Sequence, residues 1–198
     1  MSDVMARFRR ASWLTLLTLC AVCWGSGLLA EEAAVPVSIQ VELLLKVAAY
    51  DKNLATRAAG RVRLVVLVKR EDADSARSAA QALKALEKTD RLIGLPLESM
   101  TMVYGEPAAL ARQASEGNVS IVYVMPGFSD AELAAMANAL SGVNVLSVGS
   151  LAKYAQRGTV IGFDLAGGKP KLLVHLGQAR RQNVELSSSV LKLMRVIE

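Results

Sequence analysis

The sequence predicts an α/β protein with a mostly parallel sheet flanked by helices, a C-terminal antiparallel hairpin and a closing helix. Three observations lead to this prediction. Short stretches rich in β-branched residues alternate with longer helix-forming stretches, which is typical of parallel strands joined by helical crossovers. Two strand-like stretches near the end are separated by a Gly-Gly pair, which favours a tight hairpin. Beyond them, apolar residues recur at helical spacing.

The parallel part of the sheet is predicted from apolar stretches at residues 62–68, 99–104, 119–124 and 143–148. The first reads Val-Arg-Leu-Val-Val-Leu-Val and is almost continuously apolar, as expected of a strand that is covered on both faces. Pro96 stands shortly before the second stretch. It argues against a central strand at that point, because proline cannot donate a hydrogen bond to a sheet ladder.

Helices are predicted before and between these strands, at residues 39–50, 71–88, 107–115, 130–140 and 151–156. The run Asp51-Lys52-Asn53 ends the first of them. Pro107 opens the third, because the fixed backbone angle of proline suits the first helical position. Ser129 and Ser150 precede the last two helices, and we expect each hydroxyl to cap the helix that follows it.

After residue 158 the alternation gives way to a different pattern. Residues 159–165 and 169–176 are predicted to form an antiparallel hairpin joined through Gly167-Gly168. A short basic segment and a closing helix follow. The helix would carry one apolar stripe, made of Leu186, Val190, Leu193 or Met194, and Ile197. Such a stripe packs on the chain's own sheet or seats in a partner's groove.

The N-terminus has the order of a secretory leader: a basic patch at residues 7–10, an apolar run from Ala11 to about Val22, and small residues up to Ala30. We expect cleavage after Ala30, since the acidic pair Glu31-Glu32 follows. The apolar stretch is also long enough for an uncleaved membrane anchor. The expectation is therefore a signal peptide at residues 1–30 and a single domain at 31–198, located in the periplasm or secreted.

Cysteine usage and charge exclude several classes of function. Cys20 and Cys23 both lie in the leader, so residues 31–198 offer no disulfide, no thiol nucleophile and no thiolate metal site. Without the leader's three arginines and one aspartate, the net charge falls from +5 to +3. That charge is too small to indicate a nucleic-acid partner.

No catalytic or cofactor motif stands out. The first predicted strand runs into Lys69-Arg70-Glu71-Asp72, without the glycines of a dinucleotide-binding turn, and neither a Walker motif nor a G-x-S-x-G elbow occurs. The acidic residues at 71, 72 and 74 begin a predicted helix, where carboxylates offset the positive helix end. We therefore interpret them as helix-start residues instead of a cation site, and we predict no cofactor and no enzymatic activity.

His175 is the only histidine and lies on the last predicted strand. We interpret it as a partly covered strand residue, because a lone histidine gives no metal-ligand spacing. A role as a pH sensor is the alternative.

Basic residues near the C-terminus are the candidates for binding a partner: Arg180, Arg181, Lys192 and Arg195. They could meet an acidic protein surface or lipid headgroups. The alternative is an ordinary solvated surface.

The C-terminal block resembles the YfiR-like family of small exported bacterial proteins. The matching residues in the hairpin region are Gly158, Ile161, Phe163 and Gly168, and those at the closing segment, where the family has an "ISSKLL" type motif, are Leu186, Ser187, Ser188 and Leu191. Weaker agreement reaches back to residues 44–50, which resemble the family's "LLKFAxY" pattern. We interpret these matching residues as structural.

The chain also departs from the family pattern. The family's opening helix commonly runs into an aromatic-proline pair, but here Asp51 follows Tyr50. Many members have cysteines in the exported domain, whereas residues 31–198 have none, so redox control is not implied.

The resemblance implies a regulator that restrains a membrane-bound diguanylate cyclase from the periplasmic side, in cyclic-di-GMP signalling. The expected partner is thus the periplasmic domain of a membrane signalling protein. The alternative is a periplasmic module that binds a small ligand or assists a transporter or sensor. The sequence leaves open which partner is bound, by which surface, and whether the chain forms a homodimer, because an interface of ordinary composition leaves no linear motif.

Overall fold

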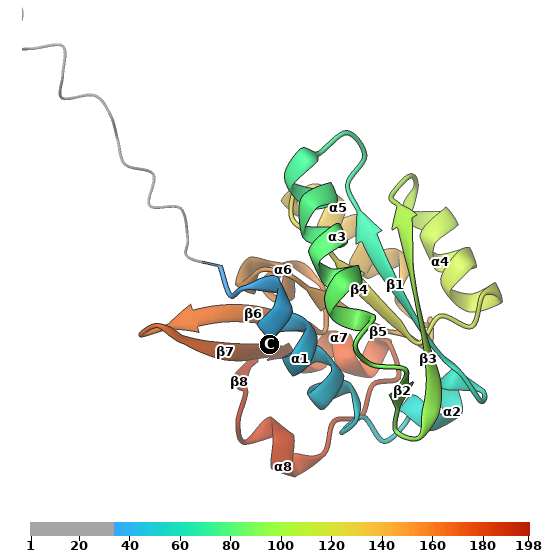
Figure 1. Cartoon of the computed structure of the whole chain (residues 1–198), viewed down its shortest axis with the longest axis vertical. Helices are drawn as coiled ribbons and strands as arrows, with labels where there is room; N and C mark the ends of the chain where they lie inside the picture. Colours follow the sequence, from blue (N-terminus) through green and yellow to red (C-terminus); the bar gives the residue numbers. More distant parts are fainter. Residues whose placement is uncertain (1–33) are drawn as a thin grey trace, which may run out of the picture. The chain divides into compact units, whose positions relative to one another are not determined.

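An eight-stranded sheet in the order β2-β3-β1-β4-β5-β6-β7-β8 organises the computed structural model, which describes residues 34–198 (Figure 1). The neighbours from β3 to β6 are parallel, and β6 and β7 form an antiparallel hairpin. Helices lie along the sheet, so the predicted α/β class is confirmed. The predicted signal peptide and its cleavage site lie outside the described residues. Within residues 34–198, no helix has the length and apolarity needed to cross a membrane.

The strands are β1 (Val62–Val68), β2 (Arg91–Leu92), β3 (Leu95–Val103), β4 (Ile121–Val124), β5 (Leu146–Gly149), β6 (Ile161–Ala166), β7 (Lys169–His175) and β8 (Arg195–Ile197). The helices are α1 (Val37–Ala48), α2 (Leu54–Ala58), α3 (Ala73–Leu86), α4 (Pro107–Glu116), α5 (Asp130–Ala139), α6 (Ala152–Arg157), α7 (Leu176–Arg181) and α8 (Ser188–Leu191). The strands and helices that were predicted from local sequence patterns are present, whereas α2 was not predicted.

The apolar run of β1 is buried because both faces of the sheet are covered. Leu64 and Val66 face the side that α1 and α3 cover, where they join the larger of two hydrophobic clusters. Val65 and Leu67 face the other side, in the cluster with the apolar residues of α4 and α5. Successive side chains of a strand point to opposite faces, so one continuous apolar sequence serves both layers.

The predicted helix-start positions hold for Asp72 and Ser129 but not for Ser150. Asp72 caps α3 by accepting a hydrogen bond from the amide of Ser75, and Ser129 forms a capping box with Glu132 at α5. The prediction for Ser150 is wrong, because α6 has Leu151 at its N-cap position. The Ser150 amide donates to the carbonyl of Val124 at 3.0 Å, so Ser150 still extends the sheet. Its hydroxyl has no hydrogen-bond partner within residues 34–198.

The closing helix is much shorter than predicted. It spans one turn, α8, and the chain then pairs with β7 as the parallel strand β8. Leu186, Val190 and Met194 are buried in the larger cluster as expected, but Leu193 is 75% exposed. A short helix is marginal in water, and the β-branched end of the chain gains ladder hydrogen bonds by joining the open side of β7. The short basic segment that was predicted before the closing helix also forms a helix, α7.

The segment around Pro96 also differs from expectation. β3 begins at Leu95, earlier than predicted, and Pro96 lies inside it opposite Arg91 of β2. Proline is tolerated here because it stands near the start of a strand whose outer neighbour is only two residues long.

Candidate interaction site

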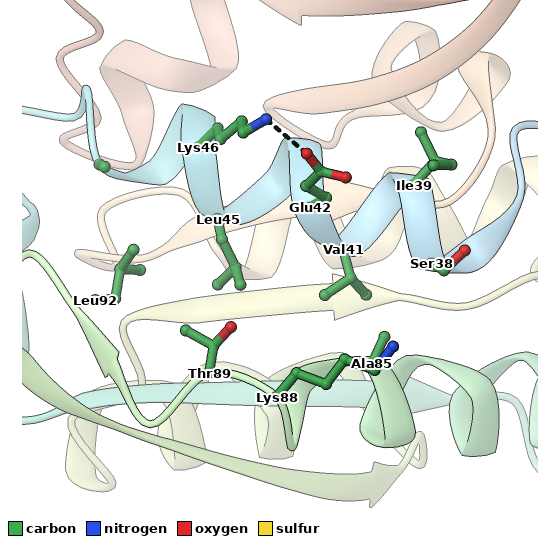
Figure 2. Close-up of a pocket in the computed structure, with 11 residues that line it drawn as sticks. Ser38, Ile39, Val41, Glu42, Leu45, Lys46, Ala85, Lys88, Thr89 and Leu92 are labelled. Atoms are coloured by element: carbon green, nitrogen blue, oxygen red, sulfur yellow. Dashed lines mark hydrogen bonds and ion pairs between the residues drawn. The ribbon is translucent and has the colours of Figure 1, made fainter.

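An apolar groove of about 610 Å³ runs between α1 and the C-terminal end of α3. Its lining residues come from α1 and its end (Ser38, Ile39, Val41, Glu42, Leu45, Lys46 and Ala49), from the end of α3 and its following turn (Ala85, Lys88 and Thr89), and from β2 (Leu92). Figure 2 shows Val41 and Leu45 pointing from α1 toward Ala85 and Thr89. We call this feature the α1–α3 groove.

A buried hydrogen-bond chain fixes the position of α1 against the sheet. The hydroxyl of Tyr123 on β4 donates to the Gln40 side-chain carbonyl at 2.5 Å, and the Gln40 amide donates to the carbonyl of Val35 at 2.6 Å. Tyr123 and Gln40 are both buried, and burial raises the pKa of Tyr123, so this phenol stays a donor. The wall of the groove is therefore held by specific polar contacts as well as by packing.

Charged side chains stand on the rim of the groove. Lys46 pairs with Glu42 at 2.6 Å, one helical turn away, and this hydrogen bond lowers the pKa of Glu42 (Figure 2). On the opposite wall, Lys88 has no ion-pair partner among the described residues. The groove thus combines an apolar floor with a cation that is available to an acidic group.

The carboxyl ends of the parallel strands are where an α/β sheet of this order usually binds small ligands. α3 and α5 follow the neighbouring strands β1 and β4 but cover opposite faces, so the topological switch point lies between these two strands. Here side chains fill it. Lys69 forms an ion pair with Glu132 across the crevice and lies 5.7 Å from the centre of the Phe128 ring.

Aromatic packing closes the same edge further. Phe128 is 3% exposed, packs edge-to-face on Tyr104 at 5.2 Å, and donates its amide hydrogen to the Tyr154 hydroxyl at 3.0 Å. Burial raises the pKa of Tyr154 to about 12. The loop before α5 also lies directly on Asp72, since a methyl group on Gly127 would stand 2.5 Å from its carboxylate. Side chains therefore fill the sheet edge at which α/β proteins usually bind small ligands.

The predicted partner-binding cations do not line the groove. Arg180 and Arg181 lie at the end of α7, Lys192 follows α8, and Arg195 begins the edge strand β8. All four are exposed. Arg181 donates two hydrogen bonds to the Gln178 side chain, at 2.9 and 2.6 Å, whereas no ion pair involves any of the four within residues 34–198.

His175 ends β7 as a partly covered residue, as predicted. Its Nδ1 accepts a hydrogen bond from the amide of Gln178 at 3.1 Å, so the neutral imidazole caps α7. Burial and then the nearby charge of Arg181 lower the pKa of His175. In the described part of the chain, no three potential ligands among His, Cys, Asp and Glu gather into a metal site.

Comparison with known proteins identifies the family. A family model for YfiR/HmsC-like proteins matches residues 39–195. The chain belongs to the YfiR/HmsC-like family. The resemblance of the C-terminal block is therefore confirmed, and the match extends over α1 and the groove. A comparison with curated proteins finds no match.

Solved structures share the fold of this YfiR/HmsC-like chain at low identity. An ABC domain from Streptococcus pneumonia, solved in complex with L-Trp, is 15% identical with a TM-score of 0.57 over 82% of this chain and 62% of its own. A conserved domain protein from Vibrio cholerae is 14% identical, with a TM-score of 0.57 over 82% of this chain and 60% of its own. CD0873 from Clostridium difficile, a substrate binding protein with adhesive properties, is 9% identical. Its TM-score is 0.53 over 74% of this chain and 58% of its own. The chain thus spans about three fifths of the length of these structures.

Residues of the YfiR/HmsC-like pattern occupy turn, core and cap positions. Ile161 and Phe163 are buried in β6, and Gly168 takes a positive φ of 72° in the hairpin turn. Gly158, with φ 135°, lies so close to α5 that an added Cβ would be 2.2 Å from that of Ala137. At the closing segment, Leu186 is buried and Leu191 packs partly on the core.

The serines of that closing segment take part in a helix start. Ser187 is the N-cap residue of α8, and its hydroxyl lies 2.9 Å from that of Ser189. Ser188 is exposed in the first turn. The structural interpretation of the matching residues is consistent with these positions.

Sequence reasoning missed the groove, although α1 contained a signal for it. The helix has apolar residues on more than one face, including the consecutive triplet Leu43-Leu44-Leu45, whereas a helix that only packs on a sheet needs one apolar stripe. Leu44 is buried, but Leu45 and the 37% exposed Ile39 face the groove. An unusually broad apolar surface on α1 could therefore have been read as a surface that packs on more than the sheet.

Proposed function

We propose that this protein is a non-enzymatic periplasmic regulator that binds a membrane signalling enzyme, a diguanylate cyclase, and restrains it. The observation that carries the proposal is the YfiR/HmsC-like match over residues 39–195. That family is known for periplasmic regulators of such cyclases. The closed strand ends at Lys69, Phe128 and Glu132 support a role that needs a surface instead of a catalytic pocket.

The α1–α3 groove is the surface that we assign to the partner. It is apolar along its floor, and Lys88, which has no ion-pair partner within residues 34–198, stands on one rim. A partner helix with an apolar face and a flanking carboxylate would fit both features, in the manner of other helix-in-groove complexes. The basic residues Arg180, Arg181, Lys192 and Arg195 form a second hypothesis for the contact.

Regulation requires only that one conformation of the partner is bound more tightly than another. A difference of about 1–3 kcal/mol in binding free energy shifts the partner's equilibrium about 5–150-fold. No chemical step is needed for this mechanism. The sign of the regulation follows from which conformation is bound, and the family resemblance favours the inactive one.

The proposal is tested with the mature chain and the exported domain of a membrane cyclase encoded by a neighbouring gene. Binding is measured by calorimetry, and cellular cyclic-di-GMP is measured after deletion of the regulator. Binding together with a rise of cyclic-di-GMP on deletion supports the proposal. If neither is observed, the assignment to a cyclase fails.

A matched pair of variants locates the contact. Ile39→Asp places a charge in the groove. Leu193→Asp replaces another aliphatic residue with the same charge, at a position that is 75% exposed and lies outside the groove. We expect at least a tenfold weaker interaction for the first variant only. Loss of binding on changing Arg180 and Arg181 to Ala, with Ile39→Asp neutral, would move the contact to α7.

A small-ligand module is the second candidate, and the size of the groove favours it. About 610 Å³ lies within the usual range for ligand pockets, and one structural relative was solved in complex with L-Trp. Thermal unfolding with millimolar L-Trp tests this reading. A rise in melting temperature that Ile39→Asp abolishes supports it, and an unchanged melting temperature counts against this ligand.

A further inference from the structure

The α1–α3 groove continues beyond Ser38 into a second cavity. This second groove has a volume of about 340 Å³ and shares Ser38, Ala85 and Lys88 with the first. It adds Pro36 at the start of α1 and Lys84, which stands one helical turn before Lys88 on α3. The two cavities therefore form one long groove between the same two helices, which we call the extended groove.

The two ends of the extended groove differ in polarity. Beside the last turn of α1 it is lined by Leu45, Ala49 and Leu92. Beside the first turn it is lined by Lys84 and Lys88, and neither lysine has an ion-pair partner within residues 34–198. Figure 2 shows the Lys88 side chain extending toward the end that Ser38 and Ala85 line. One end of the groove is thus apolar and the other is cationic.

Carboxylates of the protein leave the cationic end open to an anion. The first turn of α1 contains no acidic residue. Glu42 is the one carboxylate that lines either part of the groove, and it is paired with Lys46 at 2.6 Å. Two lysines one turn apart without an acidic neighbour of their own favour a negatively charged ligand group.

The helical walls favour a hydrocarbon chain as the rest of the ligand. The backbone amides and carbonyls of α1 and α3 are used within the helices, so an extended peptide would find no backbone partners there. A hydrocarbon chain carries no polar group that needs one. The groove also follows the 12 residues of α1, a length of about 18 Å at the rise of an α-helix. That length suits a single extended alkyl chain.

We propose that the extended groove binds a free long-chain fatty acid, with the alkyl chain between Leu45 and Leu92 and the carboxylate at Lys84 and Lys88. A bound chain would cover the apolar floor to which the partner helix is assigned. The fatty acid and the partner therefore compete, and a rise in fatty acid releases the partner. This competition, unlike the binding site itself, rests on the proposed function.

Calorimetry with the mature chain and no partner tests the site. From octanoate through decanoate to dodecanoate, all below their micellar concentrations, each added pair of methylene groups should tighten binding at least about threefold. Dodecanol has the same alkyl chain without the charge and should bind at least about fivefold more weakly than dodecanoate. Failure of dodecanoate to bind at hundreds of micromolar, or equal affinity for dodecanol, overturns the proposal.

A bulky side chain on the groove floor should block the alkyl chain. Ala85 is half-buried and lines both parts of the groove, so we expect Ala85→Phe to weaken dodecanoate binding at least about tenfold. Ala111→Phe makes the same change at a half-buried position of α4 outside the groove and should leave binding unchanged. Equal dissociation constants for the two variants would overturn the proposal. Circular dichroism checks that each variant folds.

The lysines are tested by a double variant that keeps the groove open. Lys84→Gln with Lys88→Gln should remove the preference for dodecanoate over dodecanol, while dodecanol itself still binds. Lys169→Gln with Lys192→Gln removes two exposed lysines elsewhere and should retain the preference. A preference that survives in the first double variant contradicts the assigned headgroup position. This pair of variants decides the matter if Ala85→Phe does not fold.

Competition is measured separately, so that the two proposals can fail independently. If a cyclase domain binds the mature chain, saturating dodecanoate should raise its apparent dissociation constant at least about tenfold. Simultaneous binding of both would overturn the competition. If no cyclase domain binds, the proposed function fails, and the titration without partner still decides the fatty-acid site. A melting temperature that rises with L-Trp but not with dodecanoate would overturn the fatty acid as the ligand of this groove.

Discussion

The carboxylate of Asp51 and the guanidinium of Arg57 form an ion pair at 2.6 Å in which both side chains are almost fully buried, at 0% and 1% exposure. Arg57 also donates to the Asn144 side chain at 2.9 Å and to the carbonyl of Asn183 at 3.0 Å. Asp51 accepts the amide hydrogen of Glu185 at 2.9 Å. The pair therefore ties the segment after α1 to the segment between α7 and α8.

This pair stands where the sequence departs from the YfiR/HmsC-like pattern. The family commonly has an aromatic-proline pair after its opening helix, and this chain has Asp51 after Tyr50. The carbonyl of Tyr50 accepts the amide hydrogen of Ser187 at 3.1 Å, next to the bridge between Asp51 and Leu186. Polar contacts thus fix a junction that, in the family pattern, has an aromatic residue and a proline.

Breaking this buried pair should destabilise the protein strongly. Arg57→Met leaves the Asp51 carboxylate buried without its cation, and we expect a loss of about 3–5 kcal/mol in the free energy of unfolding, measured with urea. Lys52→Met is the matched control, because Lys52 and Glu185 join the same two segments with side chains that are 60% and 58% exposed. Its loss should stay below about 1 kcal/mol. Equal losses of unfolding free energy for the two variants would contradict a larger contribution from the buried pair.

Removing one hydroxyl should loosen α1. Tyr123→Phe leaves the buried Gln40 carbonyl without its donor, which we expect to cost about 1–3 kcal/mol in urea unfolding and to raise hydrogen exchange in α1. Tyr50→Phe removes the same atom from a side chain that is 51% exposed and should change stability by less than about 0.5 kcal/mol. Unchanged exchange in α1 would contradict the role given to the Gln40 contact.

A methyl group at Gly158 should be far more costly than one at Gly168. Both glycines have positive φ, so alanine is strained at either position, by about 1–2 kcal/mol. At Gly158 the new Cβ would also stand 2.2 Å from Ala137, whereas nothing lies within 4 Å at Gly168. We expect Gly158→Ala to lose at least about 1 kcal/mol more, because α5 and α6 must separate. Similar urea midpoints for Gly158→Ala and Gly168→Ala would contradict the close approach of Gly158 to Ala137.

Stability should fall as the pH drops below about 6.5, through His175. The folded state lowers the pKa of His175, so the unfolded chain binds the proton more tightly, and stability rises with pH in the window below the unfolded value. Protonation also removes the Nδ1 acceptor that caps α7. His175→Asn keeps an acceptor without the titration. The melting temperature of this variant should depend less on pH between 5.0 and 7.5, and an unchanged dependence would contradict the prediction.

The elements that could be predicted are those whose signals are local. β1 follows from one apolar run, α5 from its capping residue Ser129, and the β6–β7 hairpin from Gly167-Gly168. The end of the chain could not be predicted this way. Its apolar spacing suited a helix, but the free side of β7 offered a strand partner, and the chain forms α8 and β8 instead.

By itself, the sequence determined the fold class, the family and the core positions, because burial on two faces, caps and glycine turns each act over a few neighbouring residues. Tertiary structure alone decided the sites. The α1–α3 groove joins residues on helices far apart in the sequence, and so does the second groove that continues it beyond Ser38. The Asp51–Arg57 pair is close in sequence, yet its burial depends on Asn144 and Asn183. Surfaces and buried polar contacts depend on which elements meet, and that is set by packing of the whole chain.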